Sequence, residues 1–187
     1  MPWTFFANGL TQSSTSVVNS QHLVTKVYFP RLAIPFATVL AGGIDFVLAF
    51  GLLLVFLLAY GVAPAASWLG VVPFLVLAFA ATLGVGLWLA ALNVLYRDVR
   101  YAVPFLAQLW LFATPIAYPS SLLTEPWRTV YALNPMVAVV DGVRWALLGT
   151  PAPSGAAVAA SCAVTLALLV SGALFFRRTE QSFADVV

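Results

Sequence analysis

The sequence predicts an all-α fold, that of a polytopic helical membrane protein with about four transmembrane helices and a short re-entrant helical hairpin. Hydrophobic residues make up 63% of the 187 and charged residues only 7%, whereas a soluble domain is about half apolar and about a quarter charged. The charges are also clustered, with none at residues 46–96 and none at 101–124. The apolar runs lack the strict alternation of membrane strands, so helices are predicted.

Four apolar runs predict the crossings, because roughly 20 apolar residues span a bilayer. In the second run, Gly84 and Gly86 leave little side-chain bulk. In the third, Pro104 is expected in the first turn, where proline is tolerated. Small residues at every fourth position of the first and last runs predict faces for close helix contact, at residues 33, 37 and 41 and at 159, 163, 167 and 171. The predicted crossings are 32–60, 71–95, 101–117 and 156–176.

Residues 118–153 differ from the runs around them because prolines punctuate them. Asn134 followed by Pro135 is typical of a helix start, and Gly149 marks the stop. The helix between them has about 14 residues and carries Asp141 and Arg144. It is too short and too charged for a comfortable crossing, so a re-entrant or interfacial helix is predicted, preceded by a shorter one.

An acid inside a predicted crossing needs an explanation. Asp45 lies within 32–60, where a charged side chain costs about 2.5–3.5 kcal/mol, so it should face protein or water. A structural role beside Gly42 and Gly43 and a functional role both remain open. Residues 1–31 begin with aromatic side chains and continue with polar ones. Composition alone favours a membrane-surface helix there over a helix that docks a partner.

The short charged loop between the second and third crossings sets the orientation. It comprises Tyr96, Arg97, Asp98 and Arg100, and Asp98 is placed to cap the helix that follows. With four crossings, six of the eight Lys and Arg residues fall on the side of this loop, and two on the other. Cytoplasmic loops are enriched in Lys and Arg, so this loop, residues 1–31 and the tail at 177–187 are expected in the cytoplasm.

The rare residues limit the chemistry. Cys162 and His22 are the only cysteine and histidine, so we predict no disulfide, no metal centre and no catalytic residues. Lys26 is the only lysine and does not follow a glycine-rich loop, so a phosphate-binding loop is lacking and any ATP must be bound by another chain. The net charge of +2 does not indicate nucleic-acid binding. These patterns do not separate a transporter, a channel and a membrane enzyme.

Several stretches, in order along the chain, resemble one family. That family is the ABC-2 type permeases that export lipid-linked polysaccharides such as O-antigen, capsule-like chains and teichoic acid. The resemblance covers residues 2–149, and the last crossing is similar in character only. The stretches that carry it are Pro2-Trp3-Thr4-Phe5-Phe6, Leu23 to Arg31, Leu92 to Tyr101, Pro115-Ile116-Ala117-Tyr118-Pro119 and Tyr131 to Met136.

The resemblance implies a single transmembrane domain, 1–187, in the bacterial cytoplasmic membrane. It implies a homodimer with two copies of a separate ATPase that binds ATP and Mg²⁺, and a lipid-linked glycan substrate among membrane lipids. Because the family has further N-terminal crossings, residues 1–31 are expected to be the end of a crossing plus the coupling region. A drug or lipid permease and a non-transport membrane protein remain alternatives.

The resemblance also implies roles for individual residues. The segment that couples to the ATPase is expected to contain Leu23, Val24, Thr25, Lys26, Tyr28, Phe29, Pro30 and Arg31. Residues 118–153 are expected to form the extracytoplasmic gate helices. The candidates for the channel and gate are Trp88, Trp110, Tyr118, Trp127, Asn134 and Pro135.

Overall fold

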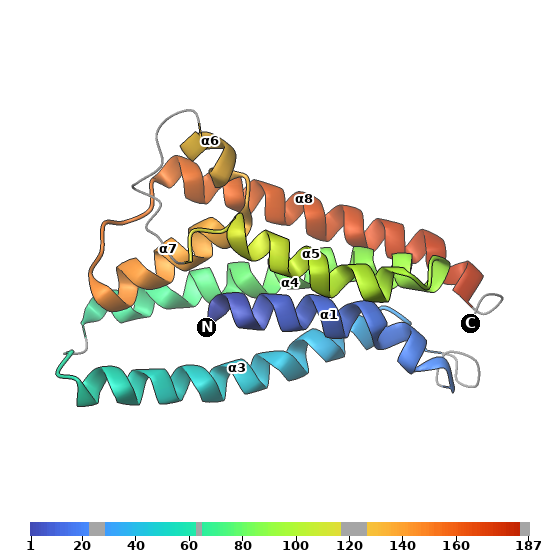
Figure 1. Cartoon of the computed structure of the whole chain (residues 1–187), viewed down its shortest axis with the longest axis horizontal. Helices are drawn as coiled ribbons and strands as arrows, with labels where there is room; N and C mark the ends of the chain where they lie inside the picture. Colours follow the sequence, from blue (N-terminus) through green and yellow to red (C-terminus); the bar gives the residue numbers. More distant parts are fainter. Residues whose placement is uncertain (23–28, 63–64, 117–126, 184–187) are drawn as a thin grey trace.

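The computed structural model of the chain describes residues 1–22, 29–62, 65–116 and 127–183, with 127–129 and 182 described by backbone alone. The described residues form a bundle of helices (Figure 1). In chain order its elements are α1 Pro2–Asn19, α3 Ala33–Ala59, η1 Ala66–Gly70, α4 Val71–Leu95, α5 Val99–Phe112, α6 Trp127–Ala132, α7 Pro135–Leu148, α8 Gly155–Thr179 and η3 Glu180–Ser182.

Helix α4 is the centre of the bundle. It packs most extensively against α1 and α8, and also against α3 and α7. The loop between α4 and α5, the end of α1 and the end of α8 lie together at what we call the Arg97 end (Figure 1). The η1 segment and the start of α8 lie at the opposite, Ser67 end. The end of α1, the loop between α4 and α5 and the end of α8 therefore share one end of the bundle, whereas the rest of α1 runs along the bundle from an N-terminus near its middle, so residues 1–31 do not all lie at the Arg97 end (Figure 1).

Within the described ranges, three helices are long and apolar enough to cross a membrane: α3, the continuous η1–α4 segment Ala66–Leu95, and α8. The expected third crossing, 101–117, corresponds to α5, and its last residue falls outside the described residues. Helix α5 has 14 residues, or about 21 Å, shorter than the roughly 30 Å hydrocarbon core. It begins at Val99 and ends at Phe112, before Pro115. Pro104 consequently lies in the second turn, inside the helix, where the prediction placed it in the first.

Helix α1 corrects the membrane-surface interpretation for the residues up to Asn19. These residues form α1 itself, which packs against α3, α4 and α5. Phe6 and Val17 are completely buried, as is the Ser13 side chain. Asn93 of α4 donates a hydrogen bond from Nδ2 to the Ser14 carbonyl at 2.9 Å, which ties α1 to the central helix.

Glycines provide the closest helix contacts. A Cβ on Gly84 would lie 2.9 Å from the backbone nitrogen of Leu169 in α8, and a Cβ on Gly86 would lie 2.7 Å from Ser13 Oγ in α1. The glycine pair therefore lets α8 and α1 approach α4 closely. The predicted alanine faces do not serve this purpose. Their side chains are exposed, namely Ala33, Ala37, Ala41, Ala159, Ala163 and Ala167, and Ser171 is half-buried.

Helix α7 has the predicted bounds. Asn134 is the N-cap and accepts a hydrogen bond from Met136 N at 3.1 Å, while Gly149 ends the helix with φ 67°. The helix is largely buried against α4 and α8. In Figure 1, α7 continues from the end of α5 toward the Ser67 end. There Ser67 Oγ donates a hydrogen bond to the Ala146 carbonyl at 2.9 Å.

Candidate functional site

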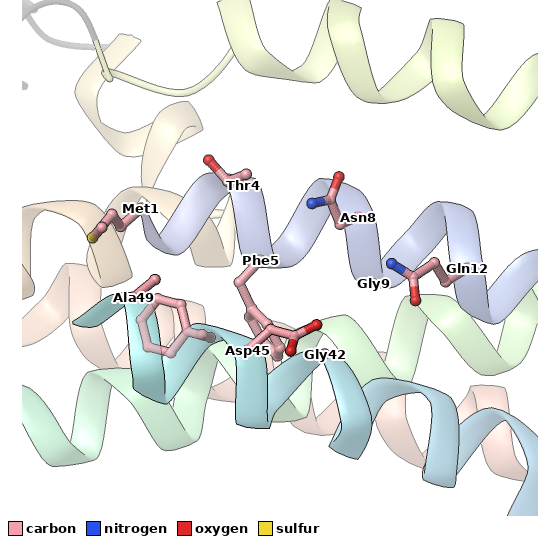
Figure 2. A pocket seen from close by; sticks show the side chains of 10 residues that line it. Met1, Thr4, Phe5, Asn8, Gly9, Gln12, Gly42, Asp45 and Ala49 are labelled. Carbon is pink, nitrogen blue, oxygen red and sulfur yellow. The ribbon is translucent and has the colours of Figure 1, made fainter. Parts of the chain in front are cut away.

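Asp45, the predicted intramembrane acid, lines a hollow between α1 and α3. Asp45 is exposed near the middle of α3, and its side chain lies beside Phe5 of α1 (Figure 2). The hollow has a volume of about 300 Å³. Phe5 and Phe46 stand side by side in its wall, with ring centroids 5.4 Å apart. Its other lining residues are Met1, Thr4, Asn8, Gly9, Gln12, Gly42 and Ala49.

A second hollow lies on the other flank of α1. It lies between α1 and α5, which also pack against each other, has a volume of about 200 Å³, and includes Gln108 in its lining. Asn8 lines both hollows. Thr4 and Asn8 project from α1 toward the side on which α5 lies (Figure 2). Thr4, Asn8, Gln12 and Gln108 are all exposed. Polar side chains therefore cover the surface of α1 from the Asp45 side to the Gln108 side.

The junction between α5 and α7 is held by side chains. Asn134 donates hydrogen bonds from Nδ2 to Thr114 Oγ1 at 3.0 Å and to the Ala113 carbonyl at 3.2 Å. Arg144 donates to the carbonyls of Pro115, at 2.9 Å, and Ile116. Its ion pair with Asp141, at 3.9 Å, is at the limit of such contacts. The gate candidates Asn134 and Pro135 are thus the start of α7 and its link to α5.

At the Arg97 end, the C-terminal segment folds back on the bundle. Arg31 donates a hydrogen bond from Nη1 to the Glu180 carbonyl. Phe183 is completely buried and packs edge-on against Phe176, with centroids 5.3 Å apart. Of the predicted coupling residues, the structure describes Phe29, Pro30 and Arg31. The others fall outside the described residues: Leu23, Val24, Thr25, Lys26 and Tyr28.

The predicted cytoplasmic loop is exposed at the same end. Tyr96, Arg97, Asp98 and Arg100 are all exposed. Asp98 occupies the N-cap position of α5, but its side chain makes no capping hydrogen bond, so the predicted cap is only positional. Arg100 bonds instead to its neighbour Tyr101, with its Nη2 2.8 Å from Tyr101 Oη and its guanidinium over the ring.

Two of the predicted channel aromatics pack between helices. Trp88 donates a hydrogen bond from Nε1 to Ser171 Oγ at 3.1 Å and stacks on Phe175, with centroids 4.3 Å apart. Trp110 meets Phe6 edge-on at 5.1 Å. Both are half-buried. Tyr118 and the side chain of Trp127 fall outside the described residues.

The polar residues Thr4, Asn8 and Gln12 were not among the site residues predicted from sequence. Their spacing of four residues puts them on one helix face, and that spacing was the signal available. As for metals, no three His, Cys, Asp or Glu side chains come together within the described ranges in a way that could hold an ion.

Comparison with known proteins places the chain in a family. Residues 1–148 match the model of the ABC-2 type transporter family. The O-antigen export system permease protein RfbA of Myxococcus xanthus is 33% identical over 191 residues, which cover 100% of this chain and 73% of that protein. Two RfbA proteins of Klebsiella pneumoniae are 30% and 29% identical over 140 residues, 74% of this chain and 54% of each relative. The chain therefore belongs to the ABC-2 type transporter family, as a membrane-spanning permease.

Proposed function

We propose that the chain is the permease subunit of an ABC exporter for lipid-linked O-antigen or a similar polysaccharide. It acts in the bacterial cytoplasmic membrane as a homodimer, with a separate ATPase that binds ATP and Mg²⁺ on the cytoplasmic side. The observation that carries this proposal is the similarity to an O-antigen export permease along the entire chain. The helical bundle that the described residues form, with three membrane-length helices among them, supports it.

The Arg97 end is proposed to receive the motion of the ATPase. Six of the eight Lys and Arg residues of the chain are expected on this side, as a cytoplasmic location requires. Phe29 to Arg31 lead directly into α3, and the hydrogen bond of Arg31 reaches the end of α8. A push on this segment would therefore act on two membrane-length helices together, without any bond chemistry in the chain.

The test begins with export itself. A strain that lacks its O-antigen permease would receive either the chain as printed or the chain extended by the upstream reading frame, and surface O-antigen would be measured. Each form would also be purified in detergent with the neighbouring ATPase. We expect a form that holds the ATPase to restore O-antigen. If neither form restores export or binds any ATPase, the proposed function is wrong.

A substitution tests the coupling role. Arg31→Ala removes the hydrogen bond to Glu180, so we expect less stimulation of ATP hydrolysis by the permease at unchanged permease abundance. Arg178→Ala is the matched control, because Arg178 is an exposed cation near the same end. Equal activity of the two variants would show that Arg31 contributes only charge.

A further inference from the structure

The exposed face of α1 has the wrong chemistry for a lipid-facing surface. A helix that meets lipid exposes apolar side chains and turns its polar side chains toward protein or water. Helix α1 instead exposes polar side chains. Thr4, Asn8 and Gln12 are exposed, while the buried face holds Phe6, Leu10 and Val17 together with the serines at 13, 14 and 16. This face is therefore built for a polar neighbour.

Residues of two other helices extend the same polar surface. Asp45 of α3 contributes the acid on one flank, and Gln108 of α5 contributes a carboxamide on the other. Asn8 lines the hollows on both flanks and so connects them. We call Thr4, Asn8, Gln12, Asp45 and Gln108 the polar band. The side chains of the polar band come from three helices, α1, α3 and α5, so the fold brings them together from distant parts of the sequence.

The chemistry of the band matches sugars. Asn, Gln and Asp side chains can accept hydrogen bonds from several hydroxyl groups, and the carboxamides can also donate. Phe5 and Phe46 offer aromatic surface in the same hollow; the partial negative charge of ring faces favours the C–H groups of a sugar ring. Asp45 is the acid in the first hollow, which Met1 also lines, and neither hollow is lined by Lys or Arg. Arg and Lys are the side chains that pair with phosphate, so this lining matches the glycan better than a phosphate-bearing carrier.

We propose that the polar band lines the hydrated path of the exported glycan, with Asn8, Gln12, Asp45 and Gln108 as hydrogen-bonding partners of successive sugar hydroxyls. This inference rests on the proposed function and deepens it, since it assigns the residues that contact the glycan. The hollow of about 300 Å³ that Asp45 lines lies at the lower limit of ligand pockets, roughly 300–1,000 Å³. It suits a single sugar ring of a chain that slides past.

Cysteine labelling tests whether the band is hydrated, independently of transport. In a Cys162→Ser background, Asn8→Cys and Gln108→Cys would be treated in membranes with a small, negatively charged methanethiosulfonate. Leu48→Cys is the matched control, because Leu48 is 70% exposed on α3, one turn from Asp45, in apolar surroundings. Burial in an apolar medium raises a thiol pKa, and one unit lowers the reactive thiolate tenfold, so the two band positions should react about tenfold or more faster than the control.

Protection tests the ligand. The probe is O-polysaccharide released from its lipid carrier, with dextran as the control glycan. We expect the O-polysaccharide, and not dextran, to slow labelling at both positions. Asn8→Leu removes one neutral hydrogen-bonding group, so the affinity for the glycan should weaken about 3- to 10-fold. In the export assay this variant should therefore place less O-antigen on the surface. Asp45→Asn keeps the shape and some hydrogen bonding and should be milder than Asp45→Leu.

Three results would overturn the inference. Labelling of both band positions at the rate of Leu48→Cys would show that a second copy or another protein segment seals the band. Fast labelling without protection by the O-polysaccharide would show a hydrated surface that does not bind glycan. Full export by both Asn8→Leu and Asp45→Leu would have the same meaning. If the unsubstituted chain does not export, the proposed function is contradicted. The labelling rates still measure whether the polar band is hydrated, because labelling does not require transport.

Discussion

The contact between α4 and α8 gives the sharpest prediction of stability, because backbone meets backbone there. A Cβ on Gly172 of α8 would lie 2.6 Å from the carbonyl oxygen of Gly84, whereas ordinary contact begins at 3.4 Å. A single methyl group at Gly172 therefore requires the two helices to separate by about 0.8 Å. No flexible side chain can absorb that shift.

The cost of Gly172→Ala follows from this geometry. Forcing an extra carbon into a packed contact costs about 1–3 kcal/mol. The separation would also stretch the hydrogen bond from Trp88 to Ser171, now 3.1 Å, beyond its useful range. The higher helix propensity of alanine offsets roughly 0.5–1 kcal/mol of this. We therefore expect a net loss of about 1–2 kcal/mol, or a fall of about 2–8 °C in the unfolding midpoint of a chain of this size.

The assay is thermal unfolding of the purified protein in detergent, followed by the loss of the monodisperse peak. Gly51→Ala is the matched control, because Gly51 lies inside α3 and a Cβ there would meet nothing within 4 Å. It should leave the midpoint unchanged or raise it slightly. If Gly172→Ala and Gly51→Ala unfold at the same temperature, the α4–α8 contact is looser than described and the reasoning fails.

Further substitutions probe other contacts. Asn134→Ala removes the cap of α7 and its link to α5, so we expect a loss of about 0.5–2 kcal/mol in thermal unfolding, larger than for Ser154→Ala, whose cap of α8 is exposed. Arg144→Met keeps side-chain length but deletes the donors to two carbonyls; we expect a loss of about 1–3 kcal/mol in thermal unfolding, and an unchanged midpoint would contradict this role. Phe183→Ala empties a fully buried site at a cost of about 3–5 kcal/mol; an unaltered unfolding midpoint would show that the C-terminal segment is not part of the core.

Local rules made parts of the fold predictable from sequence. The bounds of α7 were predictable because Asn134, Pro135 and Gly149 determine a helix start and stop through their own backbone chemistry. The glycines of α4 were informative because so small a residue inside an apolar run is most useful where another helix approaches. Both signals depend on residues near one another in the chain.

Signals that depend on a distant neighbour were weaker. The alanines at 33, 37 and 41 share a helix face, but sequence does not reveal whether a second helix meets that face, and their side chains are exposed. For the site, Asp45 was evident as a charge in an apolar run. Asn8 and Gln12 were missed because uncharged polar residues are also typical of a membrane surface. Only the structure shows that α1 packs against three helices while these polar side chains stay exposed.

The junction between α5 and α7 has a mechanical consequence. A continuous helix can bend sharply only by breaking its backbone hydrogen bonds, whereas here the chain is already interrupted and the exposed carbonyls are satisfied by Asn134 and Arg144. Those side-chain bonds can break and re-form without unwinding a turn. The described ends of α5 and α7 are therefore joined by two polar side chains, Asn134 and Arg144, whose hydrogen bonds determine how firmly α7 is held against the end of α5.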